Sequence, residues 1–88
     1  MIKEFPTNKR ISVNDIGQTF EIITKFEGKI IFTNSETTDY LKYNLYNTDL
    51  HSFNIQNILH ENTDHIFNVD YIEFNPTRDI KSITIKSL

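Results

Sequence analysis

Two strand-like runs early in the chain place the strongest constraint on its fold. In the first run, which precedes Gly28, residues alternate so that Phe20, Ile22 and Phe26 share one face of an extended strand. The second run follows this glycine directly and is dense in β-branched and aromatic side chains. Because glycine supplies the positive φ that a tight turn needs, the pattern predicts a β-hairpin over residues 19–33 that turns at Glu27-Gly28.

Short helices and two further strands are expected after this hairpin. Residues 36–43 have acids in the first turn and a lysine in the last, the order that complements a helix dipole. Apolar residues favour further helical turns in 50–59 and 65–67, although residues 55–58 could also be extended. Residues 69–74 and 80–85 are typical of strands. This order predicts an α+β fold, in which an antiparallel sheet of the N-terminal hairpin and the C-terminal strands is covered by short central helices.

The length of the chain, 88 residues, suits one small domain. We expect residues 1–15 to form a polar lead-in and residues 16–88 to form a single small α+β domain. The chain has no cysteine, which excludes a disulfide scaffold, a thiolate metal site and a cysteine nucleophile. No apolar run approaches the roughly 20 residues of a membrane span, and the first residues lack the apolar region of a signal peptide. A cytoplasmic location without membrane contact is therefore expected.

Acidic residues concentrate in the middle of the chain. Residues 35–79 carry eight of them against Lys42 and Arg78, a net charge of −6, whereas the whole chain has a net charge of −3. Direct nucleic-acid binding is not expected, because no Lys/Arg stripe is present to neutralise phosphates. The acids form either a solvated face or a surface that docks a partner protein with a basic surface.

Tyrosines accompany the acids in this middle part of the chain. Three of them recur every third residue, as on one face of a helix, and they are either interface anchors or core residues. The predicted partner-binding residues are Asp39, Tyr40, Tyr43, Tyr46, Glu61, Asp64, Asp70 and Asp79.

No pattern in the sequence indicates a catalytic or metal site. His60 and His65 are five residues apart, about 140° out of register on an ideal helix, whereas the zincin pattern needs a spacing of four. The segment between them is therefore interpreted as a polar loop. The chain has neither a glycine-rich phosphate loop nor a Gly-x-Ser-x-Gly motif. We therefore predict a protein that is not an enzyme and has no metal and no cofactor.

Three segments of the chain resemble parts of PAS domains. Residues 27–34 are similar to the opening hairpin of that family, in which an acid-Gly turn leads into an apolar strand ending in Asn. Residues 36–43 stand where PAS domains have a short helix, although Lys42 replaces the usual glycine. Residues 54–64 resemble a segment that ends in a His-Pro-x-Asp-like loop, with Glu61 in place of the proline.

The resemblance covers roughly residues 16–67 and implies a non-catalytic module for protein–protein interaction or small-molecule sensing. Such a module would dock a partner protein through its acidic surface, and a homodimer stays an alternative. A ligand would lie between the sheet and the helices; the same residues would otherwise simply make the core. The residues of this predicted ligand pocket are Phe20, Ile22, Ile31, Leu41, Phe53, Ile58, Leu59, Ile72 and Phe74.

A different class of function is also compatible with the sequence. A small protein of a phage or mobile element could inhibit a host machine, as anti-restriction and anti-CRISPR proteins do, by binding its basic surface. The acidic middle segment and the missing catalytic motifs motivate this alternative. An internal cavity would favour the sensor, whereas a solid core and acids clustered on one face would favour the inhibitor.

Overall fold

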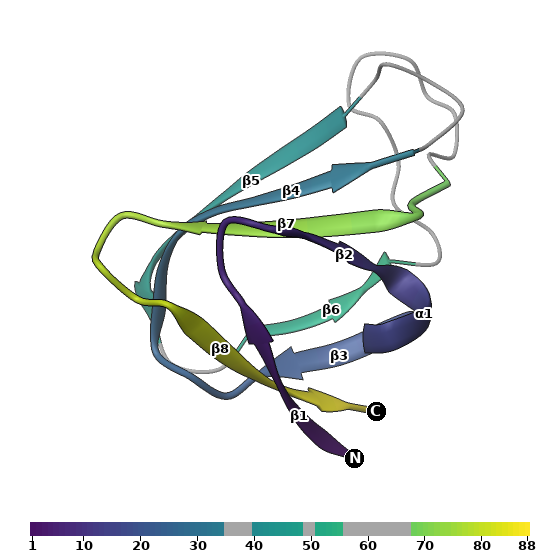
Figure 1. Ribbon diagram of the computed structural model, residues 1–88, viewed down its shortest axis with the longest axis horizontal. Coiled ribbons are helices and arrows are strands. Elements are labelled where there is room, and N and C mark those ends of the chain that lie inside the picture. Colours follow the sequence, from purple (N-terminus) through teal and green to yellow (C-terminus); the bar gives the residue numbers. More distant parts are fainter. Residues whose placement is uncertain (35–39, 49–50, 56–67) are drawn as a thin grey trace.

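The computed structural model describes residues 1–34, 40–48, 51–55 and 68–88. These residues form a nearly all-β fold with two four-stranded antiparallel sheets and one short helix (Figure 1). The elements, in chain order, are β1 (Ile2–Pro6), β2 (Arg10–Ser12), α1 (Val13–Ile16), β3 (Thr19–Ile22), β4 (Phe26–Thr33), β5 (Tyr40–Thr48), β6 (His51–Asn54), β7 (Tyr71–Pro76) and β8 (Ser82–Ser87).

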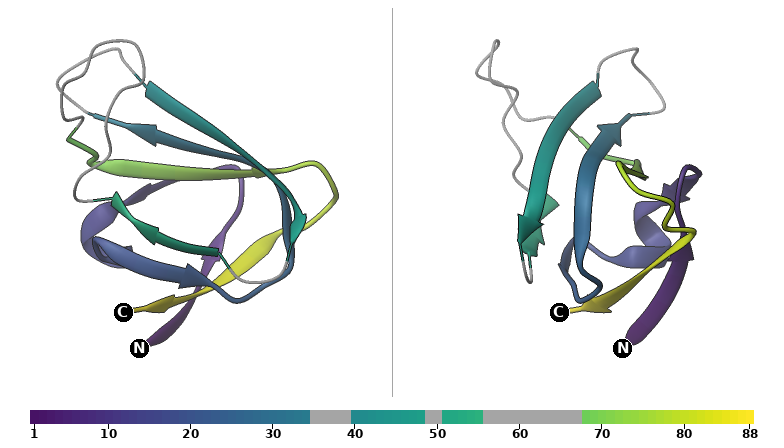
Figure 2. Two further views of the ribbon diagram at one scale, coloured as in Figure 1. Left: turned by 180° about the vertical axis from the view of Figure 1, so that it is seen from behind. Right: turned by 90° about the vertical axis from the view of Figure 1, so that its left-hand side faces the viewer.

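The two sheets lie one above the other. We call the sheet with strand order β2-β7-β4-β5 the β4 sheet and the sheet with order β1-β8-β3-β6 the β8 sheet. In Figure 1 the β4 sheet is uppermost and α1 lies at one side, and Figure 2 shows the same layers from behind and from the side. Antiparallel pairing of β1 with β8 brings the two chain ends side by side.

Strands that follow each other in the chain rarely pair in this fold. Only β4 and β5 are neighbours both in the chain and in a sheet; every other pair of consecutive described strands is divided between the two sheets. The chain therefore passes repeatedly from one sheet to the other, as the ribbon in Figure 1 shows.

The core lies between the two sheets and is aromatic. Each inner strand contributes alternate side chains to it, for example Phe20 from β3 and Phe74 from β7, both fully buried. The Phe74 ring lies edge-on to Phe20 and to Phe26, with ring centroids 6.5 Å and 6.1 Å apart. Burial of these side chains is the main force that holds the two sheets together.

The expected PAS-like α+β fold with helices over one sheet is wrong. Residues 40–43, expected to be helical, begin β5, and residues 51–54, also expected to be helical, form β6. Along β5 Leu41 is buried while Tyr40 and Lys42 are exposed, which is the period of two of a strand. Pairing with β4 therefore outweighs the weak local helix signals. The other predicted helical segments, 36–39, 56–59 and 65–67, lie outside the described residues.

The predicted hairpin over residues 19–33 is also wrong, although both of its strands exist. β3 pairs with β6 and β8, and β4 pairs with β5 and β7, so the two strands lie in different sheets. Gly28 is a residue of β4, next to a shift in the register with β5, and not a turn. The strands expected at 69–74 and 80–85 are present as β7 and β8, and they too belong to different sheets.

The first fifteen residues belong to both sheets. Expected to be a polar lead-in, they contain β1, β2 and most of α1, and β2 pairs with β7. Within the described parts of the chain, no helix has the length and apolar character needed to cross a membrane.

A buried threonine ties the β1–β2 connection to the segment before β8. Thr7 is buried, and its hydroxyl donates a hydrogen bond of 2.6 Å to the carbonyl of Ile80. We expect Thr7→Val to lower the free energy of unfolding by about 1–2 kcal/mol, because the carbonyl loses its donor while the side-chain shape is kept. Urea denaturation measures this loss. Thr77→Val is the matched control, since the exposed Thr77 hydroxyl bonds the Glu27 carbonyl at 3.2 Å, and an equal loss there would contradict the prediction.

Candidate binding face and adjoining pocket

The surface of the β4 sheet that points away from the core forms a regular grid of side chains. Because the strands are in antiparallel register, residues of β2, β7, β4 and β5 lie opposite one another in rows, with one residue from each strand in each row. We call this surface the outer face. Its two central rows are Arg10-Glu73-Ile31-Lys42 and Ser12-Tyr71-Thr33-Tyr40.

Two cations of the outer face lie over tyrosine rings. The Arg10 guanidinium is 4.4 Å from the ring centroid of Tyr71, and the Lys42 ammonium is 5.5 Å from that of Tyr40. Arg10 also donates a hydrogen bond of 3.5 Å to the Thr33 hydroxyl. Cation–π contacts and this bond orient the side chains, so the face presents two composite patches, each with an aromatic ring and a positive charge.

In the described part of the chain, the exposed charges of the outer face are positive. Among the described residues, the cations Arg10, Lys29 and Lys42 are exposed, whereas two carboxylates on the same side, Glu73 opposite Arg10 and Glu27 next to Lys29 along β4, are half-buried. Tyr40 is 54% exposed, and Tyr46 on the same strand is 73% exposed. A face with aromatic rings and cations is unexpected in a chain whose net charge is −3.

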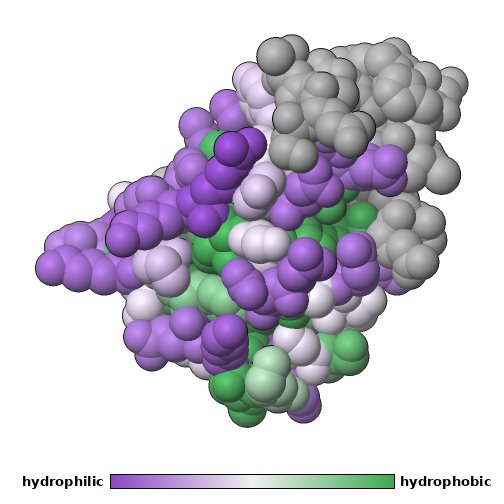
Figure 3. All heavy atoms as spheres, turned by 45° about the vertical axis from the view of Figure 1, so that its right-hand side comes forward, coloured by the Kyte–Doolittle hydropathy of each residue, from purple (hydrophilic) through white to green (hydrophobic). Residues whose placement is uncertain are grey.

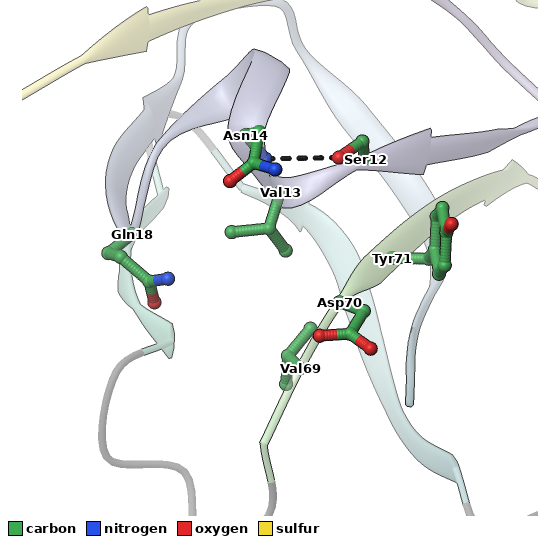
Figure 4. Close-up of a pocket in the computed structure, with 7 residues that line it drawn as sticks. All are labelled: Ser12, Val13, Asn14, Gln18, Val69, Asp70 and Tyr71. Atoms are coloured by element: carbon green, nitrogen blue, oxygen red, sulfur yellow. Dashed lines mark hydrogen bonds between the residues drawn. The ribbon is translucent and has the colours of Figure 1, made fainter. Parts of the chain in front are cut away.

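A pocket of about 210 Å³ opens beside this face (Figure 4). Helix α1 shapes one wall: the Ser12 hydroxyl caps the helix by accepting a hydrogen bond from the Asn14 N–H, and the Val13 N–H donates to the Asp70 carbonyl. Hydroxyl, amide and carboxylate groups among the lining residues suit hydrogen bonding to a polar ligand. The lining residues are Ser12, Val13, Asn14, Gln18, Val69, Asp70 and Tyr71, so Ser12 and Tyr71 belong to both the pocket and the outer face.

The predicted ligand-pocket residues are spread between the core and the surface. None of those that the structure describes lines the pocket of Figure 4. Phe53 is half-buried and stacks on Phe20 with ring centroids 5.5 Å apart, while Ile31 lies on the outer face. Ile58 and Leu59 lie outside the described residues. The remaining five are buried in the core: Phe20, Ile22, Leu41, Ile72 and Phe74.

The predicted partner-binding tyrosines lie on two sides of β5. Tyr40 and Tyr46 are six residues apart and share the outer face, as alternation in a strand requires. Tyr43 is on the opposite side, where its ring meets Phe32 edge-on at 5.5 Å. On a helix, a spacing of three residues would place the three tyrosines on one face. In a strand, the same spacing puts Tyr43 on the side opposite to Tyr40 and Tyr46.

The two predicted partner-binding acids that the structure describes, Asp70 and Asp79, do not lie close together. Asp70 lines the pocket just before β7, and Asp79 is exposed just after the other end of that strand. The six residues of β7 keep them about 20 Å apart along the strand. Asp39, Glu61 and Asp64 lie outside the described residues.

Arg10 and Tyr71, which form one composite patch, were not among the predicted site residues. For Tyr71 a signal existed, because alternation with the apolar Ile72 and Phe74 puts Tyr71 and Glu73 on one exposed side. For Arg10 no local signal existed, since its partner ring is 61 positions further along the chain.

The surface elsewhere is mostly hydrophilic in the view of Figure 3, with a hydrophobic patch at the lower end, where the termini lie in Figure 1. Met1, Ile2 and Leu88 are exposed at these termini. Among the described residues, no group of three or more His, Asp or Glu side chains could hold a metal ion. His60 and His65, considered above as a metal pair, lie outside those residues.

Comparison with protein-family models, with curated proteins and with solved structures finds no match to this chain in any of the three.

Proposed function

We propose that this chain is a non-catalytic binding module that docks a protein partner through the outer face of the β4 sheet. The observation that carries the proposal is the pair of composite patches, the exposed Arg10 over the half-buried Tyr71 and the exposed Lys42 over the exposed Tyr40. Tyr and Arg side chains are enriched among the residues that dominate binding energy at protein interfaces. Rigid aromatic side chains also lose little conformational entropy on binding.

Packing of the core supports docking on the surface over ligand sensing in the interior. The Phe20 ring lies 5.5 Å from that of Phe53 and 6.5 Å from that of Phe74, centroid to centroid, so these rings pack together where a sensed ligand would lie. The predicted ligand-pocket residues that are buried thus contact one another. A module with this core would act through its exterior.

Antiparallel pairing also supports the outer face as an interface, because it holds the patches at defined positions. Tyr71 pairs with Thr33 and Thr33 pairs with Tyr40, so the two rings are separated by one intervening strand. Strand spacing puts their backbones about 10 Å apart. Both patches therefore fit well within the area of a standard protein–protein interface.

Photocrosslinking in the cells that encode this chain tests the proposal. With benzoylphenylalanine in place of Tyr40, we expect a discrete covalent adduct to one protein, because this position lies within the proposed interface. Lys86 is the control position, since it is exposed on the outward side of the β8 sheet. Adducts of equal yield at both positions, or none at Tyr40, would remove the support for docking through the outer face.

A further inference from the structure

We infer that the partner presents an acidic polypeptide segment, rich in Asp or Glu, to the outer face. This inference rests on the proposed function, because it names the chemistry of the partner at the same surface. Its basis is the charge of the face: among the described residues, the cations Arg10, Lys29 and Lys42 are exposed on it, whereas its carboxylates, Glu27 and Glu73, are half-buried. Complementary charge at an interface speeds association and selects the partner.

The geometry of the cations suits carboxylates. The Arg10 guanidinium lies over the Tyr71 ring, and the Thr33 hydroxyl accepts a hydrogen bond from one of its nitrogens. The other N–H groups of a guanidinium held in this way can still match a carboxylate in bidentate geometry. Arg10 is thus held in a conformation that can receive Asp or Glu with little further loss of entropy.

The distance between Arg10 and Lys42 predicts the spacing of the acidic residues in the partner segment. Arg10 and Lys42 are the end members of one row that crosses four strands, so three strand spacings separate them. At about 4.8 Å each, this is about 14 Å between backbones, the length of four to five residues of extended chain. An extended segment lying across the strands would therefore need acids about four residues apart.

A single-stranded nucleic acid is the less favoured anion for this face. Binding of single strands relies on bases that stack on exposed aromatic faces. Here the rings of Tyr71 and Tyr40 already carry a cation over one face. Three cations also make a small phosphate-neutralising set in a chain of net charge −3.

The test is a titration of the isotopically labelled full chain, followed by NMR, with a short poly-L-glutamate peptide as the probe. We expect localised shifts at the amides of Tyr71, Ile31 and Lys42, which weaken as salt rises. Poly-L-lysine and an oligothymidine strand serve as comparison probes. Shifts at the outer face with oligothymidine at lower concentration than with polyglutamate would overturn the inference, as would polyglutamate shifts spread over the whole surface.

Charge reversal with a matched control sharpens the test. We expect Arg10→Glu with Lys42→Glu to weaken polyglutamate binding about tenfold or more. Lys81→Glu with Lys86→Glu changes the net charge equally at exposed positions after β7 and on β8, and it should weaken binding by about threefold or less. Equal losses in the two double variants would contradict the inference. If the double variant of Arg10 and Lys42 has a lowered melting temperature, Lys42→Glu alone, at an exposed position of β5, is used in its place.

The two proposals can fail separately. If benzoylphenylalanine at position 40 captures a protein while polyglutamate binding does not depend on Arg10 and Lys42, docking through the outer face stands and the acidic character of the partner is rejected. If the crosslink also fails, both are rejected.

Discussion

Gly28→Ala is expected to lower the free energy of unfolding by about 3 kcal/mol or more, one of the two largest effects of a single substitution in this protein. Gly28 lies inside β4 with a φ of +153°, which side-chain-bearing residues rarely adopt. A Cβ at this position would be 2.6 Å from the Pro76 Cα and closer still to the Asn75 carbonyl oxygen. Both are backbone atoms of β7, so relief of the clash would require the two strands to separate.

Gly17→Ala is the matched control for this prediction. Gly17 has a φ of +101°, but a Cβ there would meet its nearest atom, the Ser87 hydroxyl oxygen, at an ordinary 3.7 Å. Gly17→Ala should therefore lower the free energy of unfolding only through backbone strain, by about 1 kcal/mol. Urea denaturation of both variants separates strain from steric overlap, and equal losses would show that β4 and β7 do not approach as closely as described.

Phe74→Ala is expected to lower the free energy of unfolding by about 3–5 kcal/mol. The Phe74 side chain is fully buried and lies edge-on to both Phe20 and Phe26. Phe20 belongs to β3 in the other sheet, so the truncation leaves a cavity between the two sheets. Since small domains have only about 5–15 kcal/mol of stability, this loss would remove a large part of it.

The comparison for Phe74→Ala is Tyr46→Ala on the exposed side of β5. Tyr46 is largely exposed, so its truncation should change the free energy of unfolding by about 0.5 kcal/mol or less. The midpoint of urea denaturation measures both variants. A loss below about 1 kcal/mol for Phe74→Ala would mean that the ring is not packed between the sheets.

Local alternation predicted the inner faces of several strands. The expectation that Phe20, Ile22 and Phe26 face inward is met, since all three are buried. Alternation is readable from neighbouring residues, because successive side chains of a strand point to opposite sides. The same rule, applied to residues 40–46, would have separated Tyr43 from Tyr40 and Tyr46, but the spacing of three was interpreted as helical.

Gly28 illustrates why the pairing was misjudged. A glycine with positive φ is equally at home in a tight turn and in a strand that another backbone approaches closely. The difference between the two lies in Asn75 and Pro76, which are far along the chain and approach Gly28 only in the folded sheet. Sequence neighbours of the glycine carry no information on this approach.

The sequence by itself determined that this chain has no cysteine chemistry and which side chains of β3 and β7 enter the core, because these properties depend on composition and on adjacent residues. For β4 the prediction was wrong, because Ile31 was expected inside and lies on the outer face, between the buried Ile30 and Phe32. Only the tertiary structure decided which strands pair. β1 pairs with β8, and the outer face combines Arg10 of β2 with Tyr71 of β7. Hydrogen bonds between strands are made by backbone groups that every residue carries, so the choice of partner depends on the packing of the whole core.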